Sequence, residues 1–175
     1  MKKLVFATFA FALLAAASPA QETPKADIAV GYSVVEVLEG YTFRMNGASA
    51  SAAWSVNSWL GAVGDWGVYH GSPGVSLTTN TYTFGPRFSY RHWDRFVPFA
   101  QILAGGVHAS ALTTGFTNAS NAFAIGAGAG ADIGLDERGR FALRPQMEYF
   151  DFRGTGGNSN NARLSLSLVF HIGAK

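Results

Sequence analysis

The sequence predicts an all-β fold, an eight-stranded antiparallel up-and-down transmembrane β-barrel, from three observations. Apolar side chains alternate with small or polar ones at a period of two, and this pattern returns in eight segments. After residue 20 no apolar run reaches the roughly 18 residues of a membrane-spanning helix. Only 14% of the residues are charged and 48% are hydrophobic, whereas a soluble domain carries about 25% charged residues. Something other than water therefore covers much of the chain.

The first residues, MKKLVFATFAFALLAAASPA, have the organisation of a secretory signal peptide. Lys2 and Lys3 precede an apolar run, and small residues follow it up to Ala20. The run is short for a bilayer span. We therefore expect cleavage after Ala20, with residues 1–20 as a signal peptide and residues 21–175 as one outer-membrane barrel. An uncleaved membrane anchor is the alternative.

The expected mature chain has a formal charge of zero. Lys2 and Lys3 leave with the signal peptide, so 13 basic residues minus these two leaves 11, against 11 acidic residues. No stretch concentrates Lys or Arg, which argues against a nucleic-acid partner. Cysteine is absent, and this excludes a disulfide scaffold, a thiolate metal site and a lipid-modified cysteine anchor.

The alternation defines the strands in chain order, and only the fifth is ambiguous. The predicted ranges are 27–37, 47–56, 60–69, 81–92, 97–109, 122–135, 141–152 and 162–172. The apolar faces of the other seven strands consist, in order, of Ile28, Val30, Tyr32 and Val34; Ala48, Ala50, Ala52, Trp54 and Val56; Leu60, Ala62, Trp66 and Val68; Tyr82, Phe84, Pro86, Phe88 and Tyr90; Phe123, Ile125, Ala127, Ala129, Ala131 and Ile133; Phe141, Leu143, Pro145, Met147 and Tyr149; and Leu164, Leu166, Leu168, Phe170 and Ile172.

The connections between the strands alternate in length, as expected for a meander with two unlike ends. Short links, NSW, WDRF and DERGR, follow the second, fourth and sixth strands. Longer links follow the odd-numbered strands and include HGSPGVSLTTN, SALTTGFTNASN and RGTGGNSNN. Because they are rich in Gly, Ser, Thr and Asn, we predict that the longer links are exposed loops.

The alternation alone does not decide which face is wet, because a soluble barrel with its aromatic residues inside would show it too. The face opposite the aromatic residues is mostly Gly, Ala and Ser. Bare Gly126, Gly128 and Gly130 would weaken a solvent-facing strand, whereas inside a narrow lumen they leave room for longer side chains opposite. Lipid accepts the aromatic face without a volume limit and requires a closed sheet. The sequence therefore favours the membrane barrel, with a soluble ligand-binding barrel as an alternative.

Aromatic residues gather near both predicted strand ends, where amphipathic rings would meet the two interfaces of a bilayer. They are Trp59, Trp93, Phe96 and Phe141 at the short-turn end, and Tyr41, Phe43, Trp66, Tyr69, Tyr82 and Tyr149 toward the loop end. The distribution supports the same orientation of the barrel wall.

Charged residues on the small-residue face are expected to form a structural polar network in the lumen, since buried charges require partners. Counted from the short-turn end, Asp65 and Arg87 lie at matching heights on neighbouring strands, which predicts an ion pair. Asp132 and Arg144 face each other across the DERGR hairpin. Three further residues could extend the network: Arg91, Glu148 and Arg163.

Two other functions of these polar residues have to be weighed. The charges could line a narrow or gated pore, but an eight-stranded barrel is just wide enough for side chains to fill. A lipid-modifying enzyme would need a histidine and a serine near the membrane surface, and the pair to nominate, His171 with Ser167 or Ser165, matches no known motif. We therefore predict no enzymatic activity, no catalytic residues, no metal site and no cofactor.

The segment VPFAQILAGGVHAS after the WDRF turn and the last strand RLSLSLVFHI complete a pattern that resembles the small outer-membrane β-barrel family. The most similar members are the OmpA-type transmembrane barrel and the OmpX-like barrels. The resemblance covers about the whole mature length and rests on pattern more than on an exact motif. It implies a bacterial outer-membrane location and insertion by the outer-membrane assembly machinery, which reads the last strand. Family members usually end on an aromatic residue, whereas here Phe170 is followed by five residues, from His171 to Lys175.

The sequence thus predicts an integral bacterial outer-membrane protein whose barrel is an anchor and scaffold in outer-membrane lipid. Its surface loops would be available for interaction with a partner that the sequence does not name.

Overall fold

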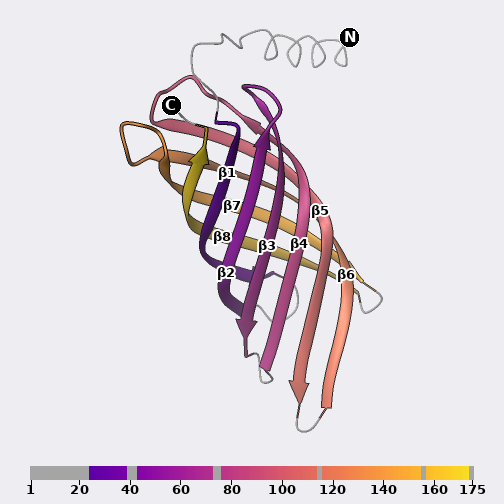
Figure 1. The fold of residues 1–175 in the computed structure, drawn as a ribbon. Coiled ribbons are helices and arrows are strands. Elements are labelled where there is room, and N and C mark those ends of the chain that lie inside the picture. Colours follow the sequence, from indigo (N-terminus) through magenta and orange to yellow (C-terminus); the bar gives the residue numbers. More distant parts are fainter. Residues whose placement is uncertain (1–23, 39–42, 73–75, 114–115, 155–156, 174–175) are drawn as a thin grey trace, which may run out of the picture.

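The computed structural model describes residues 24–38, 43–72, 76–113, 116–154 and 157–173, and all eight predicted strands are present in it (Figure 1). They are β1 (Ala26–Val37), β2 (Phe43–Ser55), β3 (Leu60–Gly71), β4 (Ser76–Ser89), β5 (Phe96–Thr113), β6 (Phe116–Gly134), β7 (Phe141–Gly154) and β8 (Gly157–Ile172). Each strand is antiparallel to the next and β8 pairs with β1, so the sheet is a closed barrel. The predicted fold class is confirmed. The predicted signal peptide lies outside the described residues.

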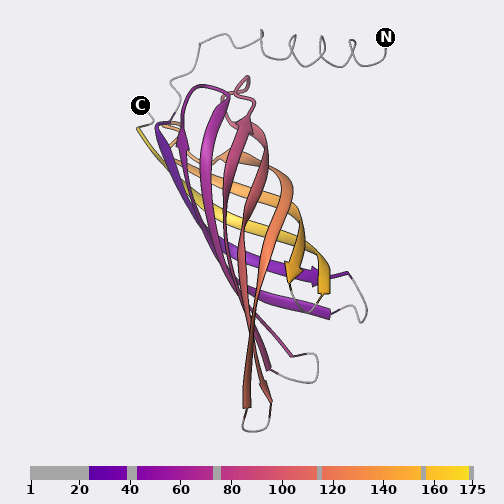
Figure 2. The same ribbon diagram turned by 90° about the vertical axis from the view of Figure 1, so that its right-hand side faces the viewer.

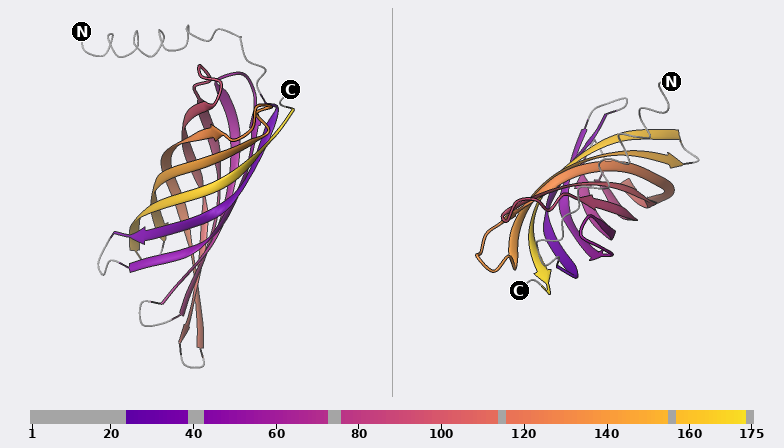
Figure 3. Two further views of the ribbon diagram at one scale, coloured as in Figure 1. Left: turned by 90° about the vertical axis from the view of Figure 1, so that its left-hand side faces the viewer. Right: turned by 90° about the horizontal axis from the view of Figure 1, so that it is seen from above.

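Closure gives β1 a partner strand on both sides. It pairs along its whole length with β2 and with β8, from Ala26 opposite Ile172 to Val37 opposite Asn161. A closed ladder of this kind satisfies the backbone groups of a wall strand without help from water. The strands tilt strongly and coil about the barrel axis (Figures 2 and 3). No helix in the described part of the chain is long and apolar enough to cross a membrane.

The apolar residues face outward and the charged residues face the lumen. Phe84 is 69% exposed on the outer wall and Leu166 is 53% exposed, whereas Arg87 and Arg144 are buried inside, at 4% and 1%. The orientation predicted from the alternation is therefore confirmed.

Strand β5, which the sequence left ambiguous, follows the same rule. Phe99, Gln101, Leu103 and Val107 are buried in the lumen, while Ile102 is exposed on the outer wall. Three of the four inward residues are apolar, so hydrophobicity does not separate the two faces of this strand.

The longer connections are mostly strand, which corrects the prediction that they are loops. β4 begins at Ser76, β5 continues to Thr113, β6 begins at Phe116 and β8 begins at Gly157. The apolar alternation fades in these extensions because both faces carry Ser, Thr and Asn, but the backbone pairing continues. The β5–β6 hairpin projects furthest from the barrel (Figures 1 and 2).

The short turns are fixed by side chains that accept backbone hydrogen bonds. Oδ1 of Asn57 accepts the N–H of Leu60 at 2.7 Å after β2. After β6, Oδ1 of Asp136 accepts the N–H of Phe141 at 2.8 Å, and this bond holds the pKa of the Asp136 carboxyl below its usual value. Gly139 in the same turn has a φ of 63°, a conformation that glycine adopts without strain.

Most of the predicted interfacial aromatic residues lie on the outer wall. They are Trp66, Tyr82 and Tyr149 toward the loop end and Trp93, Phe96 and Phe141 at the short-turn end. Trp59 stacks on the outward Phe88. Two residues correct the prediction, because Tyr69 is buried in the lumen and Phe43 packs against the same internal cluster. Tyr41 lies outside the described residues.

A ring of polar residues ends the apolar band of the outer wall on the loop side, and we call it the polar collar. Each strand contributes one residue: Glu36, Asn46, His70, Asn80, His108, Asn121, Asp151 and Asn160. Nδ1 of His108 lies 2.8 Å from Oδ1 of Asn121, and the Tyr149 hydroxyl donates to Oδ1 of Asn160 at 2.6 Å. The wall below the collar from Tyr82 of β4 to Tyr90, just after the end of this strand, matches the roughly 9–11 residues of a transmembrane β-strand.

Candidate functional site

The middle of the lumen is filled by a cluster of polar side chains that we call the plug. Its eight residues come from seven strands: Asp27 (β1), Asp65 (β3), Arg87 (β4), Gln101 (β5), Asp132 (β6), Arg144 and Glu148 (β7), and Arg163 (β8). Each is at most 8% exposed. Three guanidinium groups therefore face four carboxylates in a space that is shielded from solvent. Charges buried in this way need direct partners.

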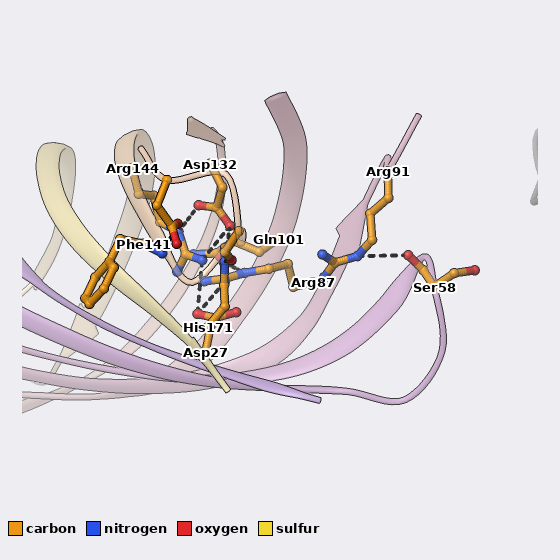
Figure 4. Close-up of polar contacts among 11 residues, drawn as sticks. Asp27, Ser58, Arg87, Arg91, Gln101, Asp132, Phe141, Arg144 and His171 are labelled. Atoms are coloured by element: carbon orange, nitrogen blue, oxygen red, sulfur yellow. Dashed lines mark hydrogen bonds and ion pairs between the residues drawn. The ribbon is translucent and has the colours of Figure 1, made fainter. Parts of the chain in front are cut away.

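Arg144 is the centre of the part of the plug nearest the short turns (Figure 4). Its Nε and Nη2 donate to the two oxygens of Asp132 at 2.5 and 2.8 Å. Nη2 also donates to Oδ1 of Asp27 at 3.0 Å. This forked contact is the geometry in which a guanidinium binds a carboxylate most strongly. The structure thus brings Asp132 and Arg144 together across their hairpin and adds Asp27 from β1.

Gln101 links this part of the plug to the next. Nη1 of Arg87 lies 3.5 Å from Oδ1 of Asp27, and its Nε donates to Oε1 of Gln101 at 2.9 Å. The amide nitrogen of Gln101 then donates to Oε1 of Glu148 at 2.8 Å. A single neutral side chain therefore connects a cation on β4 with an anion on β7.

Arg163 is the centre of the part of the plug nearest the loop end. Its Nε donates to Oε2 of Glu148. Its Nη1 donates to Oδ1 of Asp65 and to the hydroxyl of Tyr69, both at 2.7 Å. The polar contacts thus run without a break from Asp132 to Tyr69 through the barrel.

Glycines of β6 provide the room for these side chains. A Cβ atom added to Gly128 would lie 2.3 Å from Cγ of Glu148, and one added to Gly126 would lie 2.4 Å from the ring of Phe150. Real side chains do not approach so closely, so any larger residue here would displace the plug. The small residues of the inner face therefore make room for the large ones.

Two inward aromatic rings complete the plug by stacking with its cations. The guanidinium carbons of Arg87 and Arg144 lie 4.5 and 5.2 Å from the centre of the Phe99 ring. That of Arg163 lies 5.2 Å from the centre of the Phe150 ring. Such cation–π contacts are stronger where water is excluded.

The predicted ion pair between Asp65 and Arg87 is not formed, which is a correction. β4 ends at Ser89 rather than at His92, so heights counted from the expected strand ends do not match. In the actual register Asp65 lies opposite Thr83, four residues from Arg87. Asp65 pairs with Arg163 and Arg87 pairs with Asp27 instead.

The other predicted network residues divide between the plug and its margin. Glu148 and Arg163 contact each other inside it. Arg91 lies apart from the plug, and its Nε donates to the backbone oxygen of Ser58 at 3.1 Å (Figure 4). The strand β4 ends before Arg91, and this side chain lines the hollow at the short-turn mouth.

Sequence reasoning missed Asp27, Gln101 and Tyr69 as members of this region. Asp27 could have been found, because it lies two residues before Ala29 on the small-residue face of the first strand. Gln101 belongs to the ambiguous fifth strand, so the sequence did not show whether its side chain faces the lumen or the outer wall. Tyr69 was assigned to the outer wall although it shares the inward parity of Asp65.

The histidine–serine pair considered for an enzyme is not assembled. Nδ1 of His171 lies 2.9 Å from the carbonyl oxygen of Gly139, and its Nε2 lies 3.5 Å from Oδ2 of Asp132. Ser165 instead accepts a hydrogen bond from Ser33 at 2.9 Å. A nucleophile and its base must be within hydrogen-bond reach of each other, and the bonds of His171 are made elsewhere. Within the described ranges, no group of three His, Cys, Asp or Glu residues could hold a metal ion.

Two hollows of opposite character flank the plug. The hollow at the short-turn mouth has a volume of about 470 Å³, and charged residues line it, among them Arg91, Arg95, Asp94, Asp136, Arg138 and His171. The hollow at the loop end, which we call the vestibule, has a volume of about 320 Å³. Its lining includes Val37, Met45, Leu77, Val107, Phe152 and Asn161.

Solved structures of small membrane barrels are similar to this chain. Neisserial surface protein A superposes with a TM-score of 0.75 at 13% identity, covering 85% of this chain and 97% of that chain. Ail, the attachment invasion locus protein of Yersinia pestis, gives 0.61 at 17% identity, covering 85% and 100%. The N-terminal β-barrel domain of Pseudomonas aeruginosa OprF gives 0.54 at 12%, also covering 85% and 100%.

Neither a protein-family model nor a curated protein matches the sequence. The similarity is therefore one of structure, and it extends over 85% of this closed eight-stranded barrel chain. At such low identities a shared structure establishes the fold but not the activity. The chain has the fold of the small eight-stranded β-barrels of the bacterial outer membrane.

Proposed function

We propose that the protein is an integral protein of the bacterial outer membrane whose barrel is a sealed anchor and scaffold, without enzymatic activity. The outer wall supports a lipid environment. Large apolar residues are exposed there on every strand, for example Trp54, Phe84 and Leu168. A monomeric soluble protein rarely exposes so large a continuous apolar surface.

The main observation in support of a sealed barrel is the burial of the plug. Arg144, Arg163, Gln101, Glu148 and Tyr69 all face the lumen and are at most 2% exposed. Side chains from opposite walls touch there, so an ion would have to break several charge-assisted hydrogen bonds to pass. These contacts favour an anchor over a pore.

Two measurements on one refolded sample test this proposal. The folded barrel should resist SDS and migrate differently from the boiled sample, as expected for a closed membrane barrel. In planar bilayers the same folded fraction should give no steady conductance above that of protein-free bilayers. Steady single-channel steps that scale with the folded fraction would overturn the sealed barrel in favour of the narrow or gated pore. Stable solubility without detergent would favour the soluble ligand-binding barrel.

The expected partners are outer-membrane lipid and the assembly machinery of that membrane. The last strand supports the second, because Leu164, Leu166, Leu168 and Phe170 form an uninterrupted apolar stripe on the outer side of β8. Replacement of Phe170 by Asp should reduce membrane insertion in cells more than refolding into detergent. Equal losses in the two assays would argue against recognition of this strand.

The outer surface is formed by the loop-end hairpins, and these would present any interaction site. One structure of Ail contains the heparin analogue sucrose octasulfate. In this chain Nη2 of Arg153 lies 2.7 Å from Oδ2 of Asp151. Nη2 of Arg44 lies 4.0 Å from Oε1 of Glu36. Their charges are partly neutralised by neighbouring carboxylates, so we do not extend sulfated ligands to this protein.

A further inference from the structure

The vestibule has the form of a ligand pocket. Its volume of about 320 Å³ lies at the lower end of the range for small-molecule sites, roughly 300–1,000 Å³. Below it, a space of only about 10 Å³ remains beside Tyr69, Thr81 and Arg163, which is room for about one water molecule. The plug therefore closes the floor, and the pocket opens toward the loop end.

The polarity of the wall is inverted at this level. Three inward residues are apolar, Met45, Leu77 and Val107, and all three line the vestibule. The residue that follows each of them along the chain is polar and faces outward: Asn46, Thr78 and His108. Met45 and Val107 are each 3% exposed, and Met45 and Leu77 belong to one packed cluster with Val37 and Tyr69. The hollow is therefore walled on this side by close-packed apolar side chains.

The lining also restricts the charge of an occupant. None of its fifteen residues is Asp, Glu, Lys, Arg or His. The inward polar groups are hydroxyls and amides, and those of β6 and β8 belong to Ser120, Ser159 and Asn161. The amide of Asn161 is held in place, since its Nδ2 donates to the backbone oxygen of Ser159 at 2.9 Å. An ion would lose its hydration here without gaining a counter-charge.

We propose that the vestibule binds one small, uncharged, amphipathic molecule. Its apolar body would lie against Met45, Leu77 and Val107, and its hydroxyl or amide would face Ser120 and Asn161. The proposal concerns the mouth of the barrel and is independent of whether the plug conducts, so it can fail while the sealed anchor stands.

The NMR signals of the methionine methyl groups can report whether a ligand occupies the vestibule. The chain has three methionines, of which Met45 lies in the vestibule wall and Met147 lies on the lipid-facing wall, 63% exposed. The refolded barrel, carrying 13C-labelled methionine methyl groups, is titrated in detergent micelles with 2-naphthylmethanol. We expect a saturable ring-current shift of the Met45 methyl with one molecule per barrel. The Met147 methyl should show only the unsaturated drift of a probe that partitions into the micelle. A Met45 response no different from that of Met147 would overturn the proposal.

Paired variants and a charged analogue sharpen the result. Ala109→Phe fills the vestibule and should weaken binding about tenfold, or about 1.4 kcal/mol. Ala119→Phe is the control, because Ala119 lies on the adjoining strand next to Ser120 but faces outward, and it should leave binding unchanged. Should Ala109→Phe fail the heat-modifiability gel, Ser120→Phe fills the same space from β6. Naphthalene-2-carboxylate should give no saturable shift, and equal binding of this anion would contradict the uncharged ligand class.

Discussion

The same strands build the plug and the vestibule, but the side chains of the two regions make different kinds of contact. In the plug, charged groups from opposite walls touch, and every member is at most 8% exposed. In the vestibule, uncharged side chains surround a hollow of about 320 Å³. The plug therefore leaves little room for change, whereas a changed vestibule lining would leave the ion pairs of the plug intact.

Some contacts of the plug join strands that are not neighbours in the sheet. Asp27 of β1 contacts Arg144 of β7 and Arg87 of β4, and Asp65 of β3 contacts Arg163 of β8. Backbone pairing links each strand only to the two beside it. We therefore expect the plug to contribute more to the stability of the barrel than the vestibule does, and the following changes test this difference.

The largest effect is expected for Arg144→Ala. It leaves Asp132 and Asp27 buried without the guanidinium that both contact, and breaking a buried pair in this way costs about 3–5 kcal/mol. Urea titration of the refolded barrel, followed by tryptophan fluorescence, measures the free energy of unfolding. Ser120→Ala in the vestibule is the control and should change it by less than about 0.5 kcal/mol. Equal losses for the two variants would remove the distinction between the regions.

A double-mutant cycle of Asp65→Ala and Arg163→Ala should give the next largest effect. The carboxylate and guanidinium touch at 2.7 Å, so we expect a coupling free energy of about 0.5–3 kcal/mol between the two sites. The cycle of Asp65→Ala with Arg87→Ala should give a smaller coupling, because these side chains do not contact each other in the described structure. A larger coupling for the second cycle would mean that the register of β3 and β4 differs from the one described.

The difference between these two cycles shows what the sequence could and could not predict. The alternation gave the parity of Asp65, Arg87, Asp132 and Arg144 correctly, because the pleat of a strand has a fixed period of two. Asp132 and Arg144 could be paired because a short hairpin fixes their register. The partner of Asp65 could not be predicted, since Arg163 lies 98 positions away along the chain. The shear of a barrel, which sets such long-range neighbours, cannot be derived from local residue spacing.

The strand ends were misjudged for a related reason. The links after the third, fifth and seventh predicted strands consist mostly of Ser, Thr, Asn and Gly, apart from a few apolar residues such as Leu77. Hydrophobic periodicity identifies a strand only where apolar residues alternate with polar ones. Ser76 and Thr113 are therefore in strands that composition describes as loop. The same limit hid the vestibule, since Met45 and Leu77 of its apolar lining lie outside the predicted strand ranges.

Gly128→Ala tests how tightly the plug is packed. The added methyl would meet Cγ of Glu148 at 2.3 Å and the backbone oxygen of Met147 at 2.9 Å, and Glu148 cannot turn aside without leaving Arg163. Overpacking of this kind costs about 1–3 kcal/mol. Gly64→Ala on the outer wall, where an added Cβ meets nothing within 4 Å, should change the free energy of unfolding by less than about 0.5 kcal/mol. Similar losses for both would show that strand flexibility rather than space decides the effect.

Thr83→Val should give the smallest effect and in the opposite direction. Thr83 is 4% exposed, and in the described part of the chain its Oγ1 has no hydrogen-bond partner. A buried hydroxyl without a partner costs about 1–3 kcal/mol, so the valine, which has nearly the same shape, should leave the barrel equally stable or more stable by up to about 1 kcal/mol. The matched control is Thr79→Val in the vestibule wall, because Oγ1 of Thr79 lies 3.6 Å from Sδ of Met45 as a donor. Greater stabilisation by Thr79→Val than by Thr83→Val in urea titrations would mean that Thr83 is bonded inside the plug. More of the buried polar groups of the plug would then have hydrogen-bond partners than its direct contacts indicate.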